Sequence, residues 1–112
     1  MERTPDILKG TLDLLVLKAL SWGPAHGYSV ARWIEAATDD LLAVGEGTLY
    51  PALHRLEERG LVTAQWGASE NNRRAKYYEL TRQGRARLQV EIAGWSRYTA
   101  AVSAALSAPA LR

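Results

Sequence analysis

The 112-residue chain contains no cysteine and no phenylalanine. The absence of cysteine excludes a disulfide scaffold, a thiolate zinc site, an iron–sulfur cluster and a cysteine nucleophile. The absence of phenylalanine leaves leucine, valine, isoleucine, four tryptophans and five tyrosines to fill a core. With 47% hydrophobic and 23% charged residues, the composition is that of a single globular domain rather than a disordered chain.

Long apolar runs are also missing. A membrane-spanning helix needs about 18 uninterrupted apolar residues, and the richest stretch, Leu12 to Leu20, is interrupted by Asp13 and Lys18. The polar start of the chain, residues 1–6, does not resemble a signal peptide. We therefore expect a soluble, cytoplasmic protein with no membrane partner.

The formal net charge of +2 hides an uneven distribution. Residues 1–40 carry four basic and six acidic side chains, whereas residues 71–87 carry six basic side chains against Glu79 alone. A local cluster of cations indicates contact with a polyanion such as nucleic acid. The alternative is a solvated face whose arginines point into water.

Helical periodicity dominates the sequence, interrupted by one strand–turn–strand pattern. The expected helices cover residues 6–22, 27–37, 46–59 and 82–106; the expected strands cover 61–66 and 75–80, with a polar hairpin tip at 67–74. Pro51 cannot donate a hydrogen bond to the carbonyl of Gly47, so we expect the first turns of the third helix to be irregular.

This order predicts a mainly α fold with a two-stranded β wing, that is, a winged helix-turn-helix followed by a long C-terminal dimerisation helix. The DNA-binding domain would span residues 1–81, and the dimerisation helix and tail residues 82–112. A two-stranded ribbon is unstable alone, so we expect Val62, Trp66 and Tyr78 to pack it on the helices.

Residues 47–62 read GTLYPALHRLEERGLV. This segment closely resembles the G-T-L-Y-P-x-L-x-R-L-E-x-x-G-L-V signature of PadR-family transcriptional regulators. The G-T-L of residues 10–12, the H-G-Y of residues 26–28 and the Y-Y-x-L-T-x-x-G pattern of residues 77–84 are similar to further motifs of that family. One departure is Gly45, where the family usually has serine or another N-cap residue.

The resemblance implies a homodimeric winged-helix repressor that binds double-stranded promoter DNA. The single helix after the wing implies the short subgroup, in which the C-terminal helix makes the dimer. Family members respond to aromatic or drug-like compounds, so the resemblance also implies a small effector. No metal or other cofactor is expected.

The third helix would present its polar face to DNA, while Leu49, Leu53 and Leu56 form its core face. The candidate DNA contacts, taken from the second helix, the third helix and the wing, are Tyr28, Thr48, Tyr50, Pro51, His54, Arg55, Asn72, Arg73, Arg74 and Lys76. Three alternatives stay open at this point. Tyr50 could pack between helix and wing, Arg55 could pair with Glu58 or Glu35, and the hairpin tip could be a solvated loop.

The last helix carries an apolar seam with heptad-like spacing, which indicates a helix partner. Its members are Leu88, Ile92, Trp95, Thr99, Val102 and Leu106. We expect the first half of the helix to pack inward and the second half to pair across a two-fold axis. Trp95 could anchor this interface or stack on a flat effector.

An enzyme is not expected. His26 and His54 lie on different helices without carboxylate or thiolate groups at ligand spacing, and no glycine-rich phosphate loop or nucleophile elbow is present. Two rival functions remain: a winged-helix protein–protein module, and a small-molecule-binding protein without a DNA role.

Overall fold

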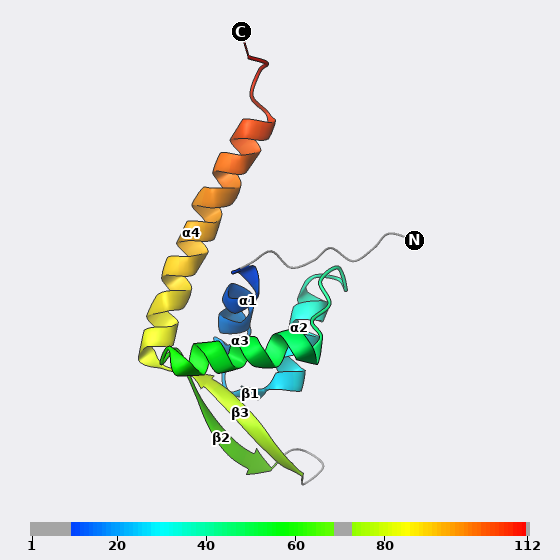
Figure 1. Cartoon of the computed structure of the whole chain (residues 1–112), viewed down its shortest axis with the longest axis vertical. Coiled ribbons are helices and arrows are strands. Elements are labelled where there is room, and N and C mark those ends of the chain that lie inside the picture. The colour runs from blue at the N-terminus through cyan, green and yellow to red at the C-terminus, as the bar shows by residue number, and fades with distance from the viewer. Residues whose placement is uncertain (1–9, 69–72, 112) are drawn as a thin grey trace.

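The computed structural model of the protein describes residues 10–68 and 73–111. Within these ranges the chain forms four helices and three strands. They are α1 (Thr11–Leu20), β1 (Ala25–His26), α2 (Gly27–Ala37), α3 (Glu46–Glu58), β2 (Val62–Ala68), β3 (Arg74–Leu80) and α4 (Arg82–Leu106). The α3 helix runs across α1 and α2, the β2–β3 wing projects from the body, and α4 begins beside the base of the wing and runs past the body in the opposite direction (Figure 1).

The β2–β3 hairpin confirms the predicted two-stranded wing, and a short third strand that was not predicted completes an antiparallel sheet in the order β1-β3-β2. Ala25 pairs with Tyr78 and His26 with Tyr77, which adds a short third strand to the wing's base. Two residues are too short a run to show strand alternation, and they lie directly before α2, so sequence patterning did not indicate them. The added strand ties the wing to the start of α2.

The core lies where α1, α2, α3 and the base of the wing meet. The first helix, which is apolar on most faces, contributes Leu12, Val16, Leu17, Ala19 and Leu20 to it. Leu49, Leu53 and Leu56 are each at most 1% exposed, which confirms the predicted core face of α3. The α3 helix continues through Pro51 as far as Glu58.

The first helix begins at Thr11, behind Gly10 in a left-handed conformation (φ 86°), and ends at Leu20 rather than at Trp22. The expected portion at residues 6–9 lies outside the described residues. The predicted bounds of α2 and α4 agree with the structure, whereas the wing strands are longer than expected, because β2 continues to Ala68 and β3 begins at Arg74.

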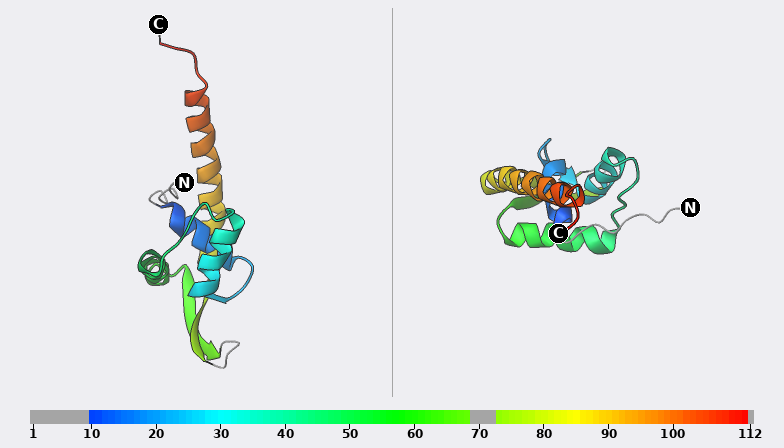
Figure 2. Two further views of the ribbon diagram at one scale, coloured as in Figure 1. Left: turned by 90° about the vertical axis from the view of Figure 1, so that its right-hand side faces the viewer. Right: turned by 90° about the horizontal axis from the view of Figure 1, so that it is seen from above.

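The junction between wing and α4 is held by Thr81. Its Oγ1 donates a hydrogen bond to the Gly60 carbonyl (2.7 Å) and accepts one from the Gly84 amide (3.0 Å), so it caps α4. The Gly60 backbone is left-handed (φ 76°), as expected for the residue that follows a helix. This junction fixes where α4 leaves the body, and the left view in Figure 2 shows α4 projecting away from the other helices.

Candidate DNA-binding surface

A concave surface opens between the start of α2, the α3 helix and the wing, with a volume of about 880 Å³. Five of the predicted DNA contacts line it: Tyr28, Tyr50, Arg73, Arg74 and Lys76. Its other lining residues are His26, Gly27, Ser29, Trp66, Ala75 and Tyr78. Residues that are far apart in the sequence are therefore brought together on one face of the molecule.

The exposed side of α3 carries Thr48, Pro51 and His54, all accessible to solvent as predicted. The His54 Nε2 lies 3.1 Å from the Glu58 carboxylate one turn further along the helix. Apart from Tyr50, the exposed side of α3 carries no large apolar side chain, which suits a helix that enters the major groove.

Tyr50 packs within the protein, against the start of α2, and its contact with DNA stays a prediction. Its ring packs against the first residue of α2, where a Cβ added to Gly27 would lie 2.9 Å from Tyr50 Cε1. The side chain nevertheless remains 43% exposed. Gly27 is thus required for the close approach of Tyr50 of α3 to the start of α2.

His26 caps α2, because its Nδ1 accepts a hydrogen bond from the Ser29 amide (3.2 Å). Its ring lies edge-on to Tyr77 (5.6 Å between centroids) and parallel to Tyr28 (6.3 Å). Tyr28 is 65% exposed at the mouth of the concave surface. The histidine therefore has a structural role that explains the H-G-Y sequence locally.

The wing places its cations at different depths. Lys76 lies 3.8 Å from the Glu57 carboxylate on α3 and over the Tyr78 ring, so it is drawn toward the body. Arg73 and Arg74 are exposed further out. Burial, followed by the neighbouring Glu57 and Tyr50, raises the pKa of Tyr78 above its ordinary value of 10.0. The predicted contact Asn72 lies outside the described residues.

Trp66 does not pack the wing on the helices, and that expectation is wrong. The side chain is 58% exposed, whereas Val62 and Tyr78 are buried as predicted. The Arg74 guanidinium covers the Trp66 ring at 4.5 Å from its centroid. Strand alternation alone did not show how far the wing extends beyond the helices that could have covered this indole.

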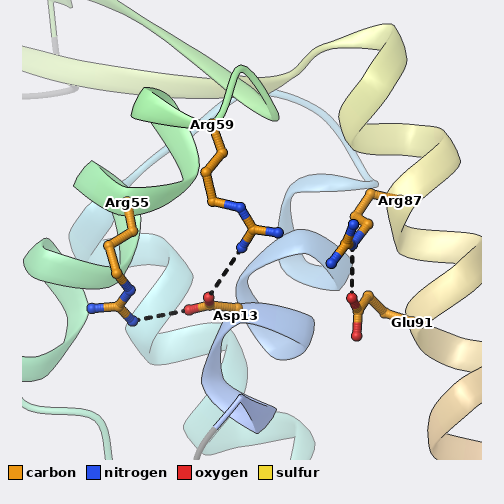
Figure 3. Close-up of polar contacts among 5 residues, drawn as sticks. All are labelled: Asp13, Arg55, Arg59, Arg87 and Glu91. Atoms are coloured by element: carbon orange, nitrogen blue, oxygen red, sulfur yellow. Dashed lines mark hydrogen bonds and ion pairs between the residues drawn. The ribbon is translucent and has the colours of Figure 1, made fainter.

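Arg55 pairs within the protein, but with neither of the carboxylates considered from the sequence. Its Nη2 donates to Asp13 Oδ1 of α1 at 3.1 Å, and Arg59 approaches Asp13 Oδ2 at 3.9 Å (Figure 3). Arg87 pairs with Glu91 of α4 at 2.7 Å on the other side of α1. Asp13 interrupts an apolar helix, and that break in the pattern was the available signal for its role.

The seam on α4 divides as expected. Leu88 is only 3% exposed and Ile92 packs against the core, so these two residues are covered within a single chain. Trp95, Val102 and Leu106 are 39%, 40% and 83% exposed. A groove of about 370 Å³ runs beside Trp95, lined by Leu14 of α1 and by Glu91, Gly94 and Tyr98 of α4, together with residues 10 and 11.

The three-helix body, the wing and the cationic concave surface define a winged helix-turn-helix protein of the DNA-binding class. The sequence profile of the transcriptional regulator PadR-like family matches residues 16–90. The chain belongs to this family of transcriptional regulators. Within the described residues, no helix is long and apolar enough to cross a membrane.

Individual proteins agree with this assignment. The chain is 30% identical over 91 residues to an uncharacterised protein of Lysinibacillus sphaericus, covering 81% of this chain and 84% of that protein. It is 35% identical over 75 residues to the transcriptional regulator YqjI of Escherichia coli K12, covering 67% of this chain but 34% of YqjI. A PadR-like transcriptional regulator from Bacillus cereus superposes with a TM-score of 0.77 at 26% identity, over 91% of this chain and 97% of that structure.

Proposed function

We propose that the protein is a ligand-responsive repressor that binds an inverted-repeat operator as a homodimer. The observation that carries this proposal is the concave surface, where Tyr28, Tyr50, Arg73, Arg74 and Lys76 meet beside the exposed side of α3. A helix flanked by cations and hydroxyl groups matches the major groove and the phosphates on either side of it.

In this proposal the exposed side of α3, with Thr48, Pro51 and His54, faces base edges in the major groove. The wing arginines contact the adjacent backbone or minor groove. The hydroxyl of Tyr28, at the start of α2, donates a hydrogen bond to a phosphate. Arg55 holds α3 against α1 through its hydrogen bond to Asp13, and this ion pair favours a supporting role for Arg55.

The homodimer would form through the outer half of α4. Trp95, Val102 and Leu106 leave apolar surface exposed on a helix that extends away from the body, and a second copy would cover it. Two winged-helix units related by a two-fold axis would then present two α3 helices about 34 Å apart on one face of DNA.

The effector would bind beside Trp95. The groove offers the aromatic rings of Trp95 and Tyr98 and the apolar side chain of Leu14 to a flat aromatic compound, with Glu91 as a polar group in its lining. The groove lies between α1 and α4, so a bound compound would change the angle between the two winged-helix units. Quenching of tryptophan fluorescence by candidate aromatics, absent in the Trp95→Phe variant, would support this site, and equal quenching in both proteins would contradict it.

Selection of bound fragments from random DNA tests the main proposal. The purified protein should enrich inverted repeats with half-sites one helical turn apart, and its log affinity should fall steeply with log salt concentration because several phosphates are neutralised. Failure to enrich any sequence, or affinity that is independent of salt, would contradict it.

The Arg73→Ala/Arg74→Ala double variant should lose at least tenfold in affinity for the selected duplex. The matched control is Arg97→Ala, which removes an exposed cation from α4, away from the concave surface. A winged-helix module that binds only another protein would give no selected duplex and no difference between these variants.

A further inference from the structure

Trp66 and Arg74 share one face of the wing. The strand register pairs Trp66 with Lys76 and Ala68 with Arg74, and paired residues in an antiparallel ladder point their side chains to the same side. On β2 the neighbours of Trp66 on this face are Ala64 and Ala68, which are too small to cover an indole. Trp66 therefore offers an open ring to the side chain that lies diagonally across, which is Arg74.

The Arg74 guanidinium lies over that ring, with its central carbon 4.5 Å from the ring centroid. A guanidinium has five N–H donors, so a contact with an aromatic ring leaves donors for hydrogen bonds to another group. Lys76, by contrast, is engaged by Glu57 at 3.8 Å. Within residues 10–68 and 73–111, no carboxylate forms an ion pair with Arg74. Its positive charge is therefore available to an anionic partner outside the protein.

We propose that Trp66 is a positioning residue for DNA binding, which holds the Arg74 guanidinium edge toward a phosphate of the DNA backbone. This inference rests on the proposed function. The indole limits the rotamers of a long side chain before DNA arrives, so less conformational entropy is lost when the phosphate contact forms. Trp66 acts through Arg74 and makes no base contact of its own.

The test is a double-mutant cycle on the duplex selected by the wild-type protein, read by fluorescence anisotropy. An exposed cation–π contact of ordinary strength corresponds to a two- to fivefold change, so Trp66→Ala should weaken binding by about that factor. Arg74→Ala should weaken it more, and adding Trp66→Ala to Arg74→Ala should have no further effect. Trp66→Tyr, which keeps an aromatic face, should restore most of the loss.

Gln65→Ala is the matched control, because Gln65 is an exposed neighbour on the opposite face of the same strand. Equal melting temperatures for Trp66→Ala and wild type would show that the fold is intact, as expected for a side chain that is 58% exposed. Trp66→Ala binding as tightly as wild type, or losses from Trp66→Ala and Arg74→Ala that multiply, would overturn the inference while the proposed function stands. A wild-type protein without affinity for any duplex would overturn both.

Discussion

Asp13 of α1 accepts a hydrogen bond from Arg55 of α3 at 3.1 Å, although the two residues are 42 positions apart in the chain. The same carboxylate lies 3.9 Å from Arg59, one turn further along α3. Residues 11 and 14, on either side of Asp13 in α1, line the groove beside Trp95. The contact therefore connects α3, the proposed DNA-facing helix, to the helix that borders the proposed effector site.

Removing this contact should cost a modest amount of stability. Asp13→Asn and Arg55→Gln should each lower the free energy of unfolding by about 0.5–1 kcal/mol, because the pair is partly exposed and screened by water. A double-mutant cycle in urea should give a coupling energy of similar size that shrinks at high salt. Arg97→Gln is the control, since Arg97 pairs with no carboxylate among the described residues. Strictly additive losses would contradict the pairing.

Gly84 should tolerate no side chain. A Cβ added there would collide with the Leu61 carbonyl oxygen, which already accepts a hydrogen bond from the Thr81 amide. Gly84→Ala should therefore lower the free energy of unfolding by about 1–3 kcal/mol, the usual cost of overpacking. Gly94→Ala, in the same helix but with nothing within 4 Å of the added Cβ, should be neutral or stabilising by up to about 1 kcal/mol. Equal thermal stability of the two variants would contradict this account.

Periodicity predicted the four helices well because each has a clear apolar face or a strong terminal signal. Leu49, Leu53 and Leu56 repeat at helical spacing, and Thr81 marks the start of α4. The tertiary pairings were not predictable in the same way. Nothing in the local sequence indicates that Ala25 pairs with Tyr78 or that Asp13 reaches Arg55 on another helix, because both contacts depend on how distant segments pack together.

Only part of the candidate site could be predicted from the sequence, because the site also depends on how distant segments pack together. Charge and motif resemblance identified Tyr28, Tyr50, Arg74 and Lys76, which the structure gathers on one concave surface. The instability of an isolated two-stranded ribbon suggested that Trp66 packs on the helices, yet the length of the wing leaves this side chain exposed. Residue type alone does not predict whether a side chain is buried or exposed when this depends on how far a hairpin projects.

Gly27→Ala should act through Tyr50. The added methyl group would force the Tyr50 ring to move, so we expect a loss of about 1 kcal/mol in stability, at the low end for overpacking because a side chain can shift. The same substitution in a Tyr50→Ala background should cost far less, since the obstructing ring is gone. Chemical denaturation of the four proteins measures both effects. An equal loss in the two backgrounds would show that Gly27 is needed for another reason.

Val102→Glu should separate the proposed dimer. Val102 is 40% exposed on the seam of α4, and a carboxylate at a buried dimer contact would be desolvated without a partner. Analytical ultracentrifugation should then find single copies, and affinity for the selected inverted repeat should fall at least tenfold. Ala104→Glu places the same charge on the opposite side of the helix and should leave both properties unchanged. Dimers of undiminished stability in Val102→Glu would exclude this seam.

Tyr78 should make the fold sensitive to alkaline pH. Burial raises the pKa of its phenol above the ordinary value of 10.0, with Glu57 and Tyr50 adding to the shift, so the folded state holds the proton more tightly than the unfolded state. The stability linked to this proton is therefore fully present below pH 10 and is lost as the pH rises through the folded-state pKa.

Tyr78→Phe cannot lose a phenolic proton, and the difference in unfolding free energy between the two proteins isolates the effect from other titrating groups. Urea denaturation from about pH 8 to about pH 11 should show wild type losing stability relative to Tyr78→Phe only at the alkaline end. A constant difference across this range would mean that Tyr78 titrates alike in the folded and unfolded chains.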